Sequence, residues 1–135
     1  MQPEDLTGWL RGFLDAHGAA AGTVHVRESD VLALRAAINI PPKVREVTST
    51  IPRGKGMAGL AWERDRAVAT CNLKADTSGD VRPGAKAVDA QAAVAIPVHG
   101  AAGELRAVVG IAFMDEREFS DEELDRLEQA ASSLP

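Results

Sequence analysis

The stretch IPRGKGMAG, at positions 51–59, holds three glycines in the pattern G-x-G-x-x-G, at Gly54, Gly56 and Gly59. This spacing is the fingerprint of dinucleotide-binding loops, in which a strand runs into the first glycine and a long helix follows the last. Here Pro52 comes just before the glycines, and proline is a poor residue for a central strand. The segment after Gly59 is also too short for a crossover helix. We therefore expect these glycines to allow a tight turn and the close packing of a short helix, and not to bind NAD.

On both sides of this stretch, apolar residues recur with the period of two that is typical of strands. The predicted strands cover residues 22–28, 31–40, 67–71, 92–99 and 104–114. In the second strand, we expect one face to carry Leu32, Leu34, Ala36, Ile38 and Ile40. Tight turns join the first two strands and the last two, which predicts an antiparallel sheet.

Helices are predicted at both ends of the chain. The first covers about residues 3–17, where apolar residues recur every three or four positions. The closing helix covers about residues 120–133 and begins with Ser120 and Glu123 in the spacing of a capping box. Short helices are expected near residues 43–50 and 57–66. The sequence thus predicts a single α+β domain over residues 1–135.

Composition narrows the class of function. The chain has 135 residues and a net charge of -5, with its basic residues scattered, which argues against nucleic-acid binding. Its single cysteine, Cys71, cannot form an internal disulfide. We find no signal peptide and no apolar run long enough to span a membrane, so we expect a cytoplasmic protein without a membrane partner. The three histidines are scattered, so we expect no metal and no other cofactor.

Three segments, in this order, resemble the GAF domain family. They are IPRGKGMAGLAWERDRAVATCNL at 51–73, AVAIPVHGAAGELRAVVGIAF at 93–113 and FSDEELDRLEQAASSL at 119–134. The resemblance extends from about Gly22 to Leu134. It implies a GAF-like central antiparallel sheet of about six strands, with the N- and C-terminal helices packed on one face. It also implies a ligand pocket on the other face.

The family includes an enzyme group, the free methionine-(R)-sulfoxide reductases. Sulfoxide reduction passes through a sulfenic acid and a disulfide, so it needs a nucleophilic and a resolving cysteine. Where these reductases carry cysteines, this chain has Ala58 and the segment 84–91, which holds none. A reductase that uses Cys71 and an external thiol partner is therefore the alternative to a non-catalytic protein. The Asn-Lys pair of cyclic-nucleotide-binding members and a histidine beside the cysteine, as in bilin-binding members, are also absent.

We therefore expect a small-molecule-sensing, regulatory GAF domain in signal transduction, which acts as a homodimer through its terminal helices or on a signalling partner protein. A scaffold that binds no ligand is a further alternative. The segment 72–86 is expected to cover the pocket, as the resemblance implies, and Cys71 is the candidate for a redox-sensitive thiol. The candidate ligand-binding residues are Arg53, Met57, Trp62, Asn72, Asp76, Thr77 and Ala93.

Overall fold

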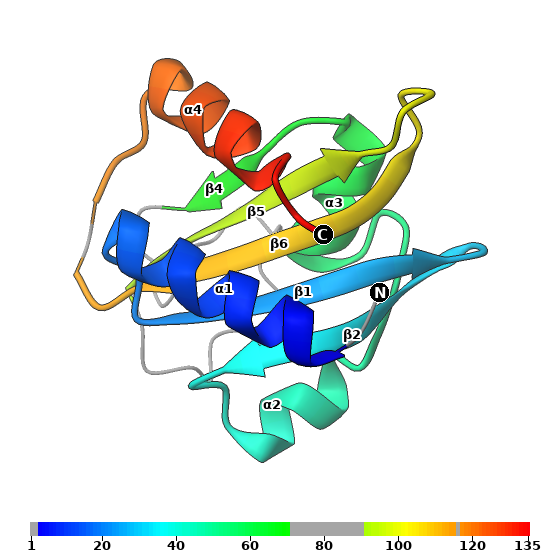
Figure 1. Cartoon of the computed structure of the whole chain (residues 1–135), viewed down its shortest axis with the longest axis horizontal. Coiled ribbons are helices and arrows are strands. Elements are labelled where there is room, and N and C mark those ends of the chain that lie inside the picture. Colours follow the sequence, from blue (N-terminus) through cyan, green and yellow to red (C-terminus); the bar gives the residue numbers. More distant parts are fainter. Residues whose placement is uncertain (1–2, 71–90, 116) are drawn as a thin grey trace.

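The computed structural model describes residues 3–70, 91–115 and 117–135. Within these ranges six strands form one antiparallel sheet in the order β3-β2-β1-β6-β5-β4 (Figure 1). The strands are β1 (Ala21–Glu28), β2 (Val31–Ile38), β3 (Thr50–Pro52), β4 (Val68–Thr70), β5 (Ala92–His99) and β6 (Leu105–Phe113). The helices are α1 (Pro3–His17), α2 (Pro42–Val47), α3 (Gly56–Arg64) and α4 (Asp121–Ala131). This architecture confirms the predicted α+β class and the antiparallel sheet.

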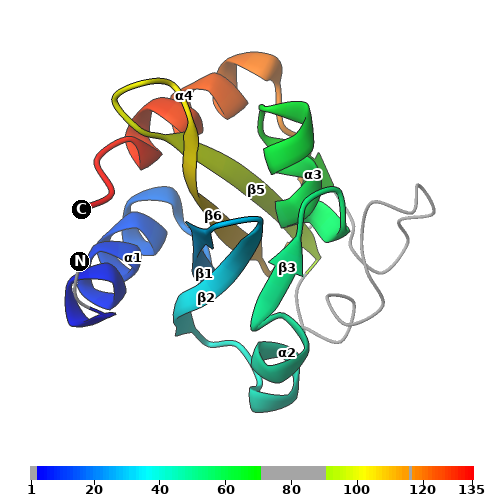
Figure 2. The same cartoon turned by 90° about the vertical axis from the view of Figure 1, so that its right-hand side faces the viewer.

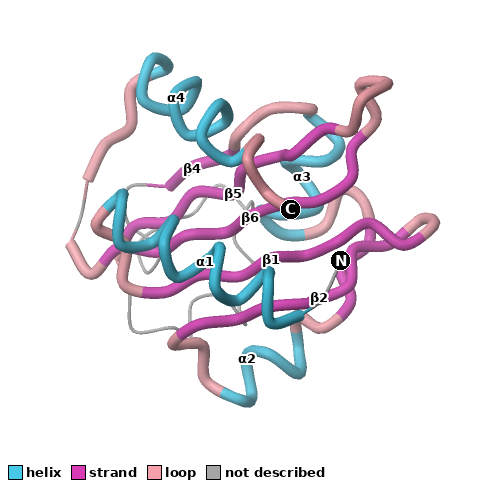
Figure 3. The backbone as a smooth tube through the Cα atoms, viewed as in Figure 1, coloured by secondary structure: helices cyan, strands magenta, loops and turns pink. Residues whose placement is uncertain are grey.

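The helices lie on opposite faces of the sheet. Helices α1 and α4 cover one face, while α2 and α3 lie on the other side (Figures 1 and 2). The backbone trace shows α1 lying over β1 and β2 and α4 lying over β5 (Figure 3). The predicted capping box is present at the start of α4, where the Glu123 amide donates to the Ser120 hydroxyl at 3.1 Å. No helix in the part of the chain that the structure describes is long and apolar enough to cross a membrane.

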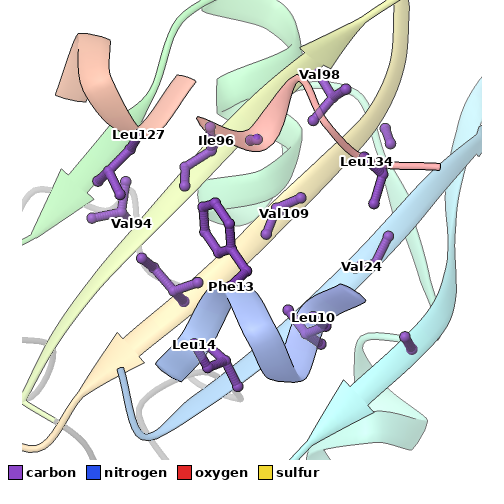
Figure 4. Packing of buried hydrophobic residues seen from close by; sticks show 14 of the residues in the cluster. Leu10, Phe13, Leu14, Val24, Val94, Ile96, Val98, Val109, Leu127 and Leu134 are labelled. Atoms are coloured by element: carbon purple, nitrogen blue, oxygen red, sulfur yellow. The ribbon is translucent and has the colours of Figure 1, made fainter. Parts of the chain in front are cut away.

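The larger apolar core lies between the sheet and the terminal helices. Leu10 of α1 is fully buried, and it packs in the same cluster as Ile96 of β5 and Val109 of β6 (Figure 4). Leu127 of α4 joins this cluster from the other helix. Burying an aliphatic side chain of this size stabilises the fold by about 1.5–3 kcal/mol, so this cluster holds both helices on the sheet.

The prediction for β2 is correct as a strand and wrong about its faces. Leu32 packs on the α3 side of the sheet, whereas Ala36 and Ile38 pack under α1 and α4. The β1–β2 ladder leaves Arg35 as an extra residue in a β-bulge. One extra residue exchanges the faces of all that follow, because side chains alternate along a strand. Beyond the strand, Ile40 packs in a separate small cluster with Val44 of α2.

The strand β3 is not among the strands predicted from the sequence. It has three residues, and it pairs antiparallel with β2 at one edge of the sheet. Pro52 is tolerated there because an edge strand needs hydrogen bonds on one side only. A dinucleotide loop requires a parallel strand before its glycines, so the arrangement supports our interpretation that G-x-G-x-x-G serves another purpose here.

The glycines of the opening stretch lie in the turn between β3 and α3 and in the first turn of α3. Gly54 and Gly56 have φ values of +82° and +66°, which favour glycine over residues with a side chain. The Gly54 amide donates to the Gly59 carbonyl at 2.9 Å. A Cβ on Gly59 would lie 2.5 Å from the Pro52 carbonyl oxygen. The predicted roles, a tight turn and the close packing of a short helix, are confirmed.

Candidate ligand pocket

A pocket lies on the face of the sheet opposite the terminal helices. Its volume is about 150 Å³, and residues from β1, β5 and β6 form its floor. Residues of α2, β3 and α3, or next to them, form its walls, among them Val47, Ile51 and Met57. The position agrees with the side of the sheet that the sequence resemblance implied.

The part of the pocket floor that β5 and β6 form consists of small residues. Ala93 and Ala95 of β5 and Gly110 and Ala112 of β6 face it. On β5 the intervening Val94 packs in the core under the terminal helices, as strand alternation requires. Gly110 has no room for a side chain, because a Cβ there would lie 2.8 Å from the Thr23 hydroxyl oxygen. The pocket therefore exists because small side chains alternate with larger ones that face the opposite core.

His25 of β1 lines the pocket and is buried, with 3% of its surface exposed. Its Nε2 lies 2.8 Å from the Thr48 carbonyl oxygen. Because a carbonyl only accepts, Nε2 carries the hydrogen and Nδ1 is left as an acceptor. Nδ1 is buried and has no hydrogen-bond partner in the described part of the chain. Burial lowers the pKa of His25, and the hydrogen bond to Thr48 opposes this effect more weakly, so the ring is neutral at pH 7.

The lowered pKa of His25 predicts a loss of stability in acid. The unfolded ring binds a proton below about pH 6.5, while the folded ring stays neutral until a lower pH. Stability is therefore complete above pH 6.5, and it falls by about 1.4 kcal/mol for each pH unit below that value while the folded ring remains neutral. Urea unfolding of wild type and His25→Gln between pH 7.5 and 5.5 measures this term, since glutamine cannot titrate. Identical pH slopes for the two proteins would contradict it.

The structure separates the predicted binding residues into three groups. Met57 and Ala93 line the pocket. Trp62 is buried in the α3-side core, and the Arg53 guanidinium lies 5.8 Å from the centre of its ring. Neither Arg53 nor Trp62 is among the described residues that line the pocket. The remaining candidates, including the redox-sensitive one, lie outside the described residues: Cys71, Asn72, Asp76 and Thr77.

Sequence reasoning did not single out Thr23 and His25, the polar side chains on the floor. A signal was available, because in β1 Thr23 and His25 alternate with Val24 and Val26. The valines pack on the helix side of the sheet, which leaves the polar pair on the pocket side. Within the described ranges, no three His, Cys, Asp or Glu side chains come together as a metal site.

Comparisons with known proteins find the same architecture in proteins of one family. A family model described as GAF domain matches residues 6–134. A free methionine-R-sulfoxide reductase from Neisseria meningitidis superposes with a TM-score of 0.77 and 19% identity, over 98% of this chain and 74% of that one. The GAF domain of an Acinetobacter phosphoenolpyruvate-protein phosphotransferase gives a TM-score of 0.76 and 16% identity, over 99% and 80%. At these identities the likeness shows the fold. A search of curated protein sequences gives no significant match.

Proposed function

Because the chain belongs to the GAF domain family, we propose that it is a regulatory module that binds a small molecule in the pocket and catalyses no reaction. The observation that carries the proposal is the preformed apolar pocket on the sheet face opposite the terminal helices. Pre-formed, mainly apolar pockets with a few polar groups are typical of small-molecule sites. The single cysteine of the chain supports a non-catalytic role, because a sulfoxide reductase cycle needs a second thiol.

The sheet offers a physical route from the pocket to the terminal helices. On β5, Ala93 and Ala95 face the pocket, while Val94 and Ile96 pack in the core under α1 and α4. A ligand on the floor is thus separated from that core by one layer of backbone. A ligand that binds one arrangement of the helices more tightly shifts the population toward it. In this proposal the module is cytoplasmic, and the terminal helices transmit the change to a second copy or to a signalling partner.

The alternative function is reduction of free methionine sulfoxide, which the fold of the Neisseria meningitidis enzyme favours. In this chain the reaction would depend on Cys71 and an external thiol partner. An assay with free methionine sulfoxide and a thioredoxin system separates the two functions. Turnover by the wild type that is lost in Cys71→Ser would overturn the non-catalytic proposal.

Filling the pocket should weaken the binding of a small molecule. Ala93→Leu places a larger side chain on the floor, and we expect it to weaken the binding of a ligand by about tenfold or more, since overpacking costs about 1–3 kcal/mol. The measurement is native mass spectrometry of the protein after incubation with a metabolite extract. Ala69→Leu is the matched control, because Ala69 is exposed on β4 and does not line the pocket. A wild type that retains no small molecule would favour the scaffold alternative.

A further inference from the structure

The polar side chains of the pocket differ in which of their hydrogen-bonding groups are still available to a ligand. Thr48 is already engaged, because its hydroxyl donates to the Val44 carbonyl at 2.7 Å and its carbonyl oxygen contacts His25. The Thr23 hydroxyl has no hydrogen bond to any described residue, and Thr23 is half-buried at the pocket. His25 keeps one acceptor, Nδ1, buried and without a partner within the same ranges.

Thr23 and His25 stand at one place in the pocket. They are two residues apart on β1, so their side chains leave the same face of the sheet next to each other. Much of the remaining described wall is apolar, with Ile40, Val47 and Met57 around the alanines of the floor. The pocket therefore has a polar end on β1 and an apolar body.

We propose that the ligand is a small neutral molecule with an apolar body and one hydroxyl or N–H group, which the Thr23–His25 pair binds. This inference rests on the proposed small-molecule function and names its ligand class. The O–H or N–H of the ligand donates to His25 Nδ1, and the Thr23 hydroxyl is the second partner of the same group. A buried acceptor without a hydrogen bond costs free energy. A ligand that supplies the missing donor therefore binds more tightly than one that does not.

Charge and size limit the ligand further. An ionised group buried against apolar walls is strongly disfavoured unless an opposite charge meets it. Apolar cavities of about 150 Å³ are known to hold a molecule as large as benzene. The ligand therefore corresponds to a single ring or a short branched chain with one polar substituent.

Phenol and toluene test the polar end, because the two have the same shape and only phenol carries a hydroxyl. Their dissociation constants are measured by NMR titration of the full chain, and binding is located by shifts of the Ala93 and Ala95 amides. We expect the wild type to bind phenol more tightly than toluene. Thr23→Val should reduce this preference by about tenfold and leave toluene affinity within about twofold, since one hydrogen-bonding group is lost at constant shape.

Two further variants sharpen the test. Thr48→Val is the matched control, because its hydroxyl is already bonded to Val44, and we expect the preference for phenol to be retained. His25→Leu removes both ring nitrogens, and with them the acceptor Nδ1, so the preference should fall as in Thr23→Val.

The outcomes separate this inference from the proposed function. Tighter binding of toluene than of phenol, or of benzoate than of phenol, would overturn the ligand class, while binding in the pocket would still support a small-molecule site. An unchanged preference in Thr23→Val would overturn the role of the pair. Failure of both probes to bind would also overturn the inference. The proposed function would then depend on the metabolite-extract experiment alone.

Discussion

Gly59→Ala should lower the free energy of unfolding by about 2–3 kcal/mol, because the new methyl group meets backbone that cannot move away cheaply. The Cβ would lie 2.5 Å from the Pro52 carbonyl oxygen and 3.1 Å from the Gly54 nitrogen. The oxygen belongs to the last residue of β3 and the nitrogen to the turn that follows it, so the helix must move away from the edge strand. Chemical unfolding monitored by tryptophan fluorescence measures the effect, since Trp62 lies on α3.

Gly8→Ala is the matched control for this change. Gly8 lies in α1, is exposed, and would have no atom within 4 Å of its new Cβ. Alanine is the better helix former, so this variant should gain up to about 1 kcal/mol in stability. If both glycines responded alike, the close approach at Gly59 would not be what fixes α3.

Leu10→Ala should cost about 2–5 kcal/mol in the free energy of unfolding, the range of a large-to-small change in a fully buried site. Leu10 is 0% exposed and packs between α1 and the sheet. It approaches β1 so closely that one of its methyl carbons would lie 3.1 Å from a Cβ on Gly22. The cavity left by the truncation would remove contacts with both the helix and the strand. Thermal and urea unfolding measure the loss.

Leu60→Ala makes the same chemical change at a half-buried position of α3 and should cost clearly less. A Leu10→Ala protein as stable as the wild type would mean that α1 adds little to the core. The terminal helices would then be weakly held, and their role in transmitting a signal would lose its physical basis.

The sequence predicted the helices and strands whose signals lie within a few neighbouring residues. The closing helix begins where Ser120 and Glu123 form a capping box, and both signals lie within four residues. The strand β3 was missed because three residues ending in Pro52 carry too short a pattern to detect. Its place at the sheet edge comes from pairing with β2, a partner that the sequence of β3 does not reveal.

The site was harder to predict for the same reason. Met57 and Ala93 were placed at the pocket through a family resemblance. The burial of His25, by contrast, depends on Thr48, which is distant in sequence and comes over the ring only when α2 is in place. Strand alternation places Thr23 and His25 on the same face of β1. The alternation does not indicate whether other elements of the chain cover that face.

The bulge at Arg35 has a consequence for how β2 tolerates insertions and deletions. The Arg35 side chain is exposed and pairs with Glu28, so substitutions there change little in either core. Deletion of Arg35 would remove the bulge and make Leu34 and Ala36 consecutive opposite His25 and Val24, so Ala36 and Ile38 would keep their places under α1. The bulge therefore makes Arg35 the position at which β2 can lose a residue without exchanging the faces of the side chains that follow.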